Sequence, residues 1–384
     1  MIDFEIDIEV EELETLCKKF SREVLLPNAR RYEKNLGWDS SALKSYFDLG
    51  ISNLLLTEEY GGFYNPMATV VAFSQLACGD CSGVIRYEEL IPVSPFLTVI
   101  GNTDVGEKIN VKHLIKSLQS NSNLISKNST VKTALVNQCF DELKNEKVVC
   151  WIPGIVFSEA DNKVEAGGLE NKEQILFVAG GDFVATFNIS DLKVTTATAG
   201  GLRSACGGLV EVNFNNAKNQ SMISFEEGFY IRSTIRLWAA SMLIGLGTAA
   251  SSYAVDYGKE RIVFEKPVLG HQANAFTLSK LVTDLEACKT ALFMGAGSAG
   301  SQLNETDQYA CWLITQAYVK ACETSTALCD FSLQLLGGHG YMKDHIVEKW
   351  WRESQDLVNM FGGRISAIED LRHSALKSTD WLSS

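Results

Sequence analysis

The chain has 384 residues, of which 46% are hydrophobic and 21% are charged, an ordinary globular composition with room for two or three domains. Its formal net charge of −13 argues against a nucleic-acid partner, because such binding depends on phosphate neutralisation by Lys and Arg. No stretch of about 18 uninterrupted apolar residues occurs, so no membrane partner is expected. The N-terminus is acidic and amphipathic, unlike a signal peptide, which predicts a cytoplasmic location.

The ten cysteines are scattered along the chain. The pair Cys78 and Cys81 has the C-x-x-C spacing, but a second pair or a histidine at metal-binding distance in the sequence is missing, so no metal site is predicted. Several other cysteines fall inside helical patterns and are expected to be reduced, buried small hydrophobes. These are Cys288, Cys311, Cys322 and Cys329.

Helical periodicity dominates the first hundred residues. Apolar side chains recur at steps of three and four between Leu13 and Leu25, which predicts one buried helical face. A second helix is expected over 40–49, with Ser40 or Ser41 as its N-cap, and a third pattern runs from Met67 to Ala77. With the polar, Asn- and Ser-rich stretch that follows, this predicts an N-terminal helical domain over residues 1–146.

The sequence between 147 and 225 has a different residue pattern. Short β-prone runs alternate with clusters of Gly, Asn and Asp, which predicts a small antiparallel sheet domain over 147–225. The runs lie at 148–152, 175–178, 183–187, 192–195 and 209–214.

From residue 226 the chain is helical again. Four long apolar-periodic segments joined by short breaks predict an antiparallel four-helix bundle over 226–384. The segments are 229–258, 270–296, 305–336 and 344–355. The expected fold class is therefore mostly α with a small β domain in the middle.

Several motifs in this layout resemble those of the acyl-CoA dehydrogenase superfamily, nearly throughout the chain and most strongly over 228–370. The family has an N-terminal helical domain, a middle β-barrel-like domain and a C-terminal four-helix bundle, in the order predicted here. The motifs are Thr57–Gly62, Gly201–Gly208 leading to Phe214, Arg261–Phe264 followed by Gln272, Gln334–Tyr341, and Val347–Arg352.

The resemblance implies an FAD site between the β domain and the bundle, completed by a neighbouring subunit. A homo-oligomer (dimer or tetramer) or a hetero-oligomer with a paralogous chain is therefore expected. A guanidinium would pair with the pyrophosphate, an aromatic ring would pack on the cofactor, and a Gly-Gly pair would allow close backbone approach. Taken singly, such an arginine is more often a solvated or ion-paired residue and such glycines a helix C-cap. The implied cofactor-binding residues are Arg261, Phe264, Gln272, Gln334, Gly337 and Gly338.

The chain departs from the family at the position of the catalytic base. Removal of the α-proton of an acyl thioester requires a desolvated carboxylate, but Phe361 occupies the usual glutamate position. A second group of relatives carries its glutamate on the first bundle helix, where this chain has Ile235. The nearest acids to Phe361, Asp356 and Glu369, are more than a helical turn away along the chain. No catalytic residue is assigned.

Two further comparisons with the family concern the flavin-lining motifs of the β domain and an arginine on the first bundle helix. Trp151–Gly154 and Phe177–Gly180 stand where relatives carry their flavin-lining motifs. Arg236 matches an arginine that relatives place near the CoA phosphates, which implies a pocket for acyl-CoA or an acyl-carrier thioester; the alternative is a surface helix arginine.

Three functions stay open. The first is an FAD oxidoreductase on an acyl thioester that is not a standard α,β-dehydrogenase. The second is a non-catalytic subunit of a hetero-oligomer, and the third is a flavin-free binding protein on the same fold.

Overall fold

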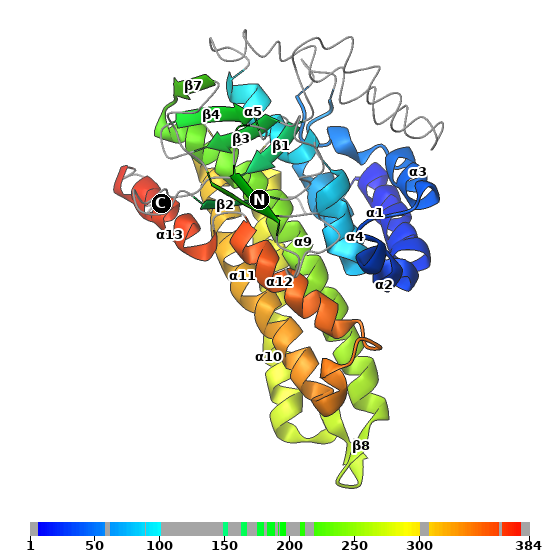
Figure 1. The fold of residues 1–384 in the computed structure, drawn as a ribbon. Coiled ribbons are helices and arrows are strands. Elements are labelled where there is room, and N and C mark those ends of the chain that lie inside the picture. The colour runs from blue at the N-terminus through cyan, green and yellow to red at the C-terminus, as the bar shows by residue number, and fades with distance from the viewer. Residues whose placement is uncertain are drawn as a thin grey trace.

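The protein is a long helical bundle with a helical domain and a group of short strands packed around its upper half (Figure 1). The computed structural model describes residues 7–57, 62–88, 90–100, 223–299, 307–360 and 363–377, together with Asp191 and the strands between 149 and 222. Phe361, most of the 201–214 motif and the 101–146 stretch lie outside the described residues.

The described residues of the N-terminal region, up to residue 100, form helices, as predicted. Helix α3 begins one residue after Asp39, whose side chain accepts the Ala42 N–H at 3.0 Å, so the cap is Asp39 and not Ser40 or Ser41. Helix α4 extends ten residues beyond the predicted Ala77 (87 − 77). The elements are α1 (Ile8–Phe20), η1 (Ser21–Leu25), α2 (Leu26–Asn35), α3 (Ser40–Asp48), η2 (Ile51–Asn53), α4 (Pro66–Tyr87) and α5 (Leu90–Ile100).

Helix α4 changes direction at Asp80, whose backbone angles (φ −158°, ψ 86°) are not helical. The Asp80 carboxylate accepts hydrogen bonds from Trp38 Nε1 and Lys349 Nζ, both at 2.7 Å. Lys349 also contacts the Glu353 carboxylate, which accepts from the backbone N–H and the hydroxyl of Ser82. The ionisable groups are almost completely buried, so this network fixes the bend of α4 against α12.

The Glu353 carboxyl shares its buried site with the carboxylate of Asp80 and one ammonium group. Burial and the negative charge of Asp80 outweigh the attraction of Lys349, so the pKa of Glu353 is raised. Those two carboxylates raise the pKa of Lys349 despite its burial.

The middle strands form two sheets. The four-stranded sheet has the order β1-β3-β4-β7 and the three-stranded sheet the order β2-β6-β5. The prediction of antiparallel pairing is wrong for β1 and β3, which run parallel. The reason is that β2 lies in the other sheet, so the chain crosses over and returns in the same direction. The strands are β1 (Val149–Ile152), β2 (Lys163–Ala166), β3 (Ile175–Ala179), β4 (Phe183–Asn188), β5 (Lys193–Thr196), β6 (Gly208–Glu211) and β7 (Asn219–Met222).

The bundle begins with α9, whose N-terminus has a capping box: Ser224 Oγ accepts the Glu227 N–H and Glu227 accepts the Ser224 N–H. The four predicted bundle helices are present, and a further helix, α13, follows them. The elements are α9 (Phe225–Glu260), β8 (Ile262–Val263), β9 (Lys266–Pro267), η8 (Val268–Gly270), α10 (Gln272–Ser298), α11 (Gln308–Leu335), η9 (Gly337–Tyr341), α12 (Val347–Met360) and α13 (Gly363–Lys377).

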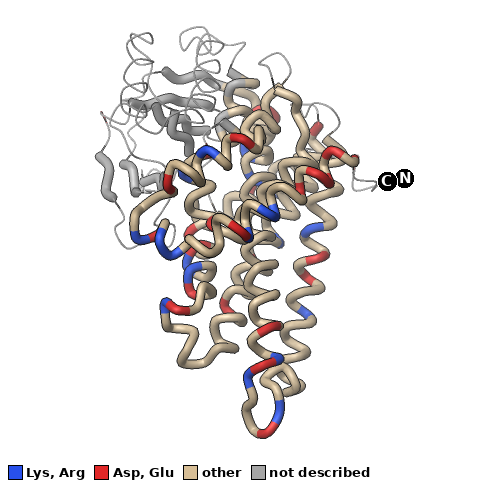
Figure 2. The backbone as a smooth tube through the Cα atoms, turned by 90° about the vertical axis from the view of Figure 1, so that its right-hand side faces the viewer, with Lys and Arg blue, Asp and Glu red and all other residues tan. Residues whose placement is uncertain are grey.

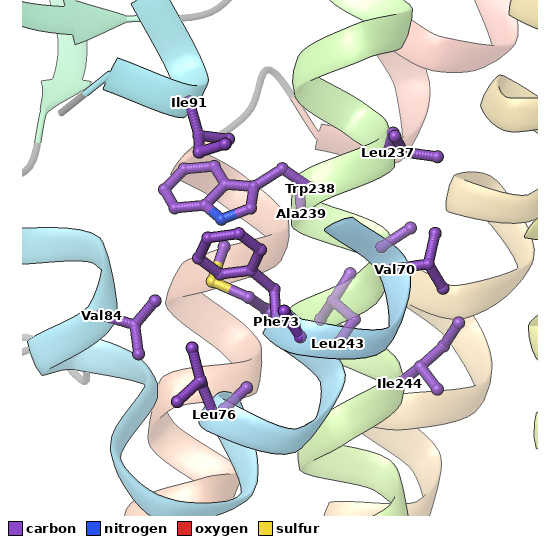
Figure 3. Packing of buried hydrophobic residues seen from close by; sticks show 14 of the residues in the cluster. Val70, Phe73, Leu76, Val84, Ile91, Leu237, Trp238, Ala239, Leu243 and Ile244 are labelled. Carbon is purple, nitrogen blue, oxygen red and sulfur yellow. The ribbon is translucent and has the colours of Figure 1, made fainter. Parts of the chain in front are cut away.

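The contact between α4 and α9 forms the centre of the core. Phe73 and Trp238 meet edge to face, with ring centroids 5.8 Å apart and an interplanar angle of 86°, and aliphatic side chains of both helices surround them (Figure 3). Helix α4 is long and apolar enough to cross a membrane, but 83% of its most apolar window is buried inside the protein. Its apolarity is therefore explained by its place in the core. The predicted burial of the four helical cysteines is confirmed.

We expect Gly245→Ala to destabilise the fold. A Cβ at Gly245 on α9 would lie 2.2 Å from the Ser74 carbonyl oxygen on α4, which forces the two helices apart. Overpacking of this kind costs about 1–3 kcal/mol of unfolding free energy, as measured by urea denaturation followed by circular dichroism.

Gly297→Ala is the matched control. Gly297 also lies in a bundle helix, but the nearest atom to its added Cβ is Met67 Sδ at 4.0 Å. This variant should match the wild type or gain up to about 1 kcal/mol from helix propensity. A loss of similar size in both variants would contradict the proposed close approach of α4 and α9.

Candidate functional site

The end of α9 directs Arg261 to the surface. The Arg261 N–H donates to the Tyr257 carbonyl at 2.9 Å and its own carbonyl accepts from Val268 N at 2.8 Å, so the chain turns back at this residue. Arg261 is exposed, and charged residues of both signs surround this tip of the bundle (Figure 2). A guanidinium here is accessible to an anionic ligand.

The hairpin that follows holds Phe264 in a strained conformation. Strands β8 and β9 pair Val263 with Lys266, so Phe264 and Glu265 form a two-residue turn with φ values of +49° and +66°. Such turns favour glycine or asparagine, because a Cβ in the left-handed region costs roughly 1–2 kcal/mol per residue. The Phe264 side chain is 87% exposed and meets the His271 ring edge to face, with 6.4 Å between the ring centroids. The turn therefore presents an aromatic ring to the outside.

The other four predicted cofactor residues lie at the same end of the bundle. Gln272 is the exposed first residue of α10, and His271 before it bonds to the Val263 carbonyl at 2.9 Å. Gln334 is exposed at the end of α11, and the next helix η9 is joined to α9 by a 3.3 Å hydrogen bond between His339 Nδ1 and Tyr257 Oη.

The glycines of η9 border open space. Gly337 has φ +58°, the left-handed conformation of a helix C-terminus, and a Cβ built on Gly337 or Gly338 meets nothing within 4 Å. The structure thus brings together six residues from three segments of the sequence: Arg261, Phe264, Gln272, Gln334, Gly337 and Gly338.

Arg236 is buried in the interior, at the contact between α9 and α13. It is 1% exposed, so the alternative of a surface arginine is wrong. Its Nη1 donates to Asp370 Oδ2 at 2.6 Å and its Nη2 to Ser366 Oγ at 3.2 Å. Arg232, one turn earlier on α9, donates to both oxygens of Asp370 at 2.8 and 2.7 Å. Two arginines of α9 therefore bind α13 through one buried carboxylate.

Electrostatics at this cluster keep Asp370 ionised. Burial raises its pKa, but the charges and hydrogen bonds of Arg236 and Arg232 outweigh burial, so the pKa of Asp370 lies below its usual value. Asp370 was not singled out from the sequence. The signal was available in the 366–370–374 spacing, which places Ser366, Asp370 and Ser374 on one helical face that proves to be buried.

The alternative base position is confirmed as apolar and inaccessible. Ile235 is 1% exposed and lies beside Arg236 on α9. Glu369, one of the two nearest acids to Phe361, is about half exposed and bonded to Arg372 at 2.8 Å. Among the described residues around the start of α13, the buried carboxylate is Asp370, and its pKa makes it a weak base.

Comparison with known proteins identifies this architecture. The model of the N-terminal domain of acyl-CoA dehydrogenases matches residues 8–104, and that of the C-terminal domain matches residues 233–364. The caffeyl-CoA reductase–Etf complex subunit CarC of Acetobacterium woodii is 33% identical over 118 residues, which is 31% of this chain and 30% of that protein. The matched region thus covers less than a third of the length of that relative.

Two further similarities cover nearly the whole chain. The probable acyl-CoA dehydrogenase YngJ of Bacillus subtilis is 21% identical over 372 residues, covering 92% of this chain and 94% of that protein. The structure of the ChsE4–ChsE5 complex of Mycobacterium tuberculosis matches with a TM-score of 0.72 at 14% identity, over 98% of this chain and 100% of that one. Similarity at this level establishes the shared fold.

Replacing Glu265 by glycine should stabilise the protein. Glycine adopts φ +66° without a Cβ penalty, so we expect a gain of about 1 kcal/mol in unfolding free energy. Glu260→Gly is the matched control, because this nearby glutamate lies in the last turn of α9, where glycine should cost up to about 1 kcal/mol. Equal effects of the two substitutions would contradict the strained turn.

Asp370→Asn should destabilise the protein by about 3–5 kcal/mol at pH 7, because it leaves two buried arginines without their anion. Since the folded-state pKa of Asp370 is lowered, the stability it contributes is present above its ordinary pKa of 3.8 and is lost as pH falls through the folded value. The wild-type advantage over the variant should therefore shrink in acid.

Urea denaturation at a series of pH values measures this difference. Glu369→Gln is the control: the neighbouring carboxylate is 49% exposed and should contribute about 0–1 kcal/mol. An Asp370→Asn variant as stable as Glu369→Gln would show that the buried cluster does not hold α13.

Proposed function

Because the chain belongs to the acyl-CoA dehydrogenase superfamily, we propose that it is an FAD flavoprotein that acts on an acyl thioester without standard α,β-dehydrogenation. One observation carries this proposal. The six residues that match the family's nucleotide-binding motifs gather, exposed, at one end of the bundle, and two of them are glycines beside open space. A protein that kept only the fold and bound no nucleotide would not require these exposed residues and glycines at one place.

The residues at this end fit a dinucleotide. The exposed Arg261 guanidinium would pair with the pyrophosphate, and Phe264 would pack on the cofactor. Gln272 and Gln334 would form hydrogen bonds, and the Gly337–Gly338 backbone would lie against the dinucleotide, since nothing blocks it within 4 Å of either Cβ position. When bound, FAD supplies two-electron redox chemistry that side chains lack.

Among the described residues near the two base positions of the family, none is a suitable base, and this limits the reaction. Phe361 and the buried Ile235 cannot take up a proton, and Asp370 is held ionised by two arginines. A base that removes an α-proton needs a carboxylate with a raised pKa and access to the substrate, and Asp370 offers neither. We therefore infer flavin chemistry in which glutamate does not abstract the α-proton.

A second candidate is a non-catalytic subunit paired with a paralogous chain in the cytoplasm. The observation that favours it is the apolar surface around the proposed cofactor site, which a partner subunit would cover. The names of the ChsE4–ChsE5 complex and of the caffeyl-CoA reductase–Etf complex subunit CarC show that similar chains occur in complexes with other chains. The apolar side chains are Ile262, Phe264, Phe276, Tyr341 and Met342, exposed by 47–94%.

The proposal predicts that the purified full-length protein takes up FAD and shows flavin absorption bands. Arg261→Gln should weaken FAD binding by roughly tenfold to a hundredfold, because it removes a charged hydrogen-bonding partner of the pyrophosphate. Arg372→Gln, an exposed arginine on α13 that is 59% exposed and paired with Glu369, serves as the control and should bind FAD normally.

Titration with FAD followed by visible spectroscopy measures both variants. A wild-type protein that remains colourless in excess FAD would overturn the proposal in favour of a flavin-free binding protein. Saturated protein should also fail to oxidise butyryl- to palmitoyl-CoA with an artificial acceptor. Copurification of a second dehydrogenase-like chain, with turnover only in the mixture, would favour the non-catalytic subunit.

A further inference from the structure

Helix α13 exposes three of its four large apolar side chains. Ile365, Ile368 and Leu376 are exposed by 42–76%. The side chains of α13 that are buried against the protein are instead small or polar: Ser366, Ala367, Asp370 and Ser374. A surface helix of a protein that works as a single copy has the opposite arrangement, because burial of its apolar stripe holds it in place. An apolar outer face of this kind marks a surface that another chain covers.

The inner face of α13 is held by other contacts. Arg232 and Arg236 of α9 bind Asp370, and α13 also packs against α11 and α12. Figure 1 shows α13 at one side of the molecule, next to α11. The exposed apolar side chains are therefore not needed to hold α13 on the bundle, and they are directed away from it.

Four residues of the outer face form one stripe along the helix. Ile365, Glu369, Arg372 and Leu376 follow one another at steps of four, three and four residues, the spacing of a helical seam. All four are exposed. Along the chain, the stripe therefore reads apolar, acidic, basic and apolar.

The stripe is complementary to a second copy of itself. Its midpoint lies between positions 370 and 371, so the two apolar residues are equally far from it, and so are the two charged residues. In a contact about a two-fold axis, residue i of one copy meets residue j of the other, and j meets i. Two antiparallel α13 helices with the axis at this midpoint therefore bring Ile365 level with Leu376 of the other copy. Glu369 lies level with Arg372 of the other copy in the same way.

The two charged residues form a closed network in that arrangement. Arg372 Nε donates to Glu369 Oε2 at 2.8 Å within one chain. A guanidinium has five N–H donors, so Arg372 can also bind the carboxylate of the other copy. Copies of a chain with a formal net charge of −13 repel each other, and the stripe, with one charge of each sign, lets them meet without adding to this repulsion.

We propose that two copies of this chain associate through the outer faces of α13, antiparallel about a two-fold axis between positions 370 and 371. The helix has 15 residues, a length of about 22 Å, so the contact is short and its formation should depend on protein concentration. Arg236, which reaches α13, and Arg261 are 25 residues apart (261 − 236), about 37 Å along α9. The contact is therefore separate from the end of the bundle proposed to bind FAD and does not depend on that proposal.

Exchange of charge between the two copies tests the contact. In Arg372→Glu the stripe carries two glutamates, and in Glu369→Arg it carries two arginines, so each variant meets a copy of itself with like charges. Sedimentation velocity of the full-length protein over a series of concentrations should show self-association of the wild type, weakened by roughly tenfold or more in each single variant. An equimolar mixture of the two variants should regain the wild-type association, because two glutamates then face two arginines.

The mixture separates this contact from a structural role of the ion pair. The Glu369–Arg372 pair within one chain is broken in both variants and stays broken in the mixture, so recovery can come only from contact between chains. Arg31→Glu is the matched control, because Arg31 and its partner Asp39 form an ion pair that is exposed to nearly the same extent. It should associate like the wild type. Circular dichroism verifies that each variant is folded.

The contact is contradicted by a wild type that stays a single copy at every concentration, and by single variants that associate as strongly as the wild type. A mixture that does not recover, or an Arg31→Glu variant that weakens association as much as Arg372→Glu, would also contradict it. Association only with a different chain would assign the face to a hetero-oligomer instead. FAD uptake should be the same in Arg372→Glu as in the wild type, so a failure of the proposed cofactor site is recognised independently.

Discussion

The arrangement of the described helices depends on one buried ammonium group. Lys349 on α12 bonds to Asp80 at the bend of α4 and to Glu353 one turn further along its own helix, and these side chains are at most 1% exposed. Without this cation, two carboxylates would be left in the core, a state that costs several kcal/mol. The network therefore fixes where α4 bends, and the bend in turn sets how the N-terminal helices lie against the bundle.

The same principle operates near the N-terminus of α9, with the signs of the charges exchanged. There, one carboxylate on α13 lies between two arginines, and burial makes each charge dependent on its partners. This arrangement affects the possible function through the charge of Arg236. Asp370 neutralises the arginine that resembles a thioester contact, and it does so beside the position where relatives have a base. Among the described residues around this cluster, no carboxylate is both free of an arginine partner and buried, as abstraction of an α-proton requires.

The end of the bundle proposed to bind FAD differs from these two buried clusters, because its residues are exposed and one turn is strained. Phe264 and Glu265 adopt left-handed backbone angles that neither residue favours, and the aromatic ring points away from the protein. Strain and apolar exposure at one place are the properties of a surface that is covered when the protein works. A cofactor and a second subunit would together cover it.

The sequence by itself determined the element types and their order. Apolar periodicity located the long helices, because the apolar residues of a helix that buries one face must recur every three to four positions. The motif spacing also singled out six residues that lie at one end of the bundle, and their role toward a nucleotide stays a prediction. Only the tertiary structure decided the pairing of charges and strands. Arg236 and Asp370 are 134 residues apart, Asp80 and Lys349 are 269 apart, and β1 pairs in parallel with β3. Such contacts form between surfaces that meet only after the chain has folded, so they cannot be predicted from the local pattern of the sequence.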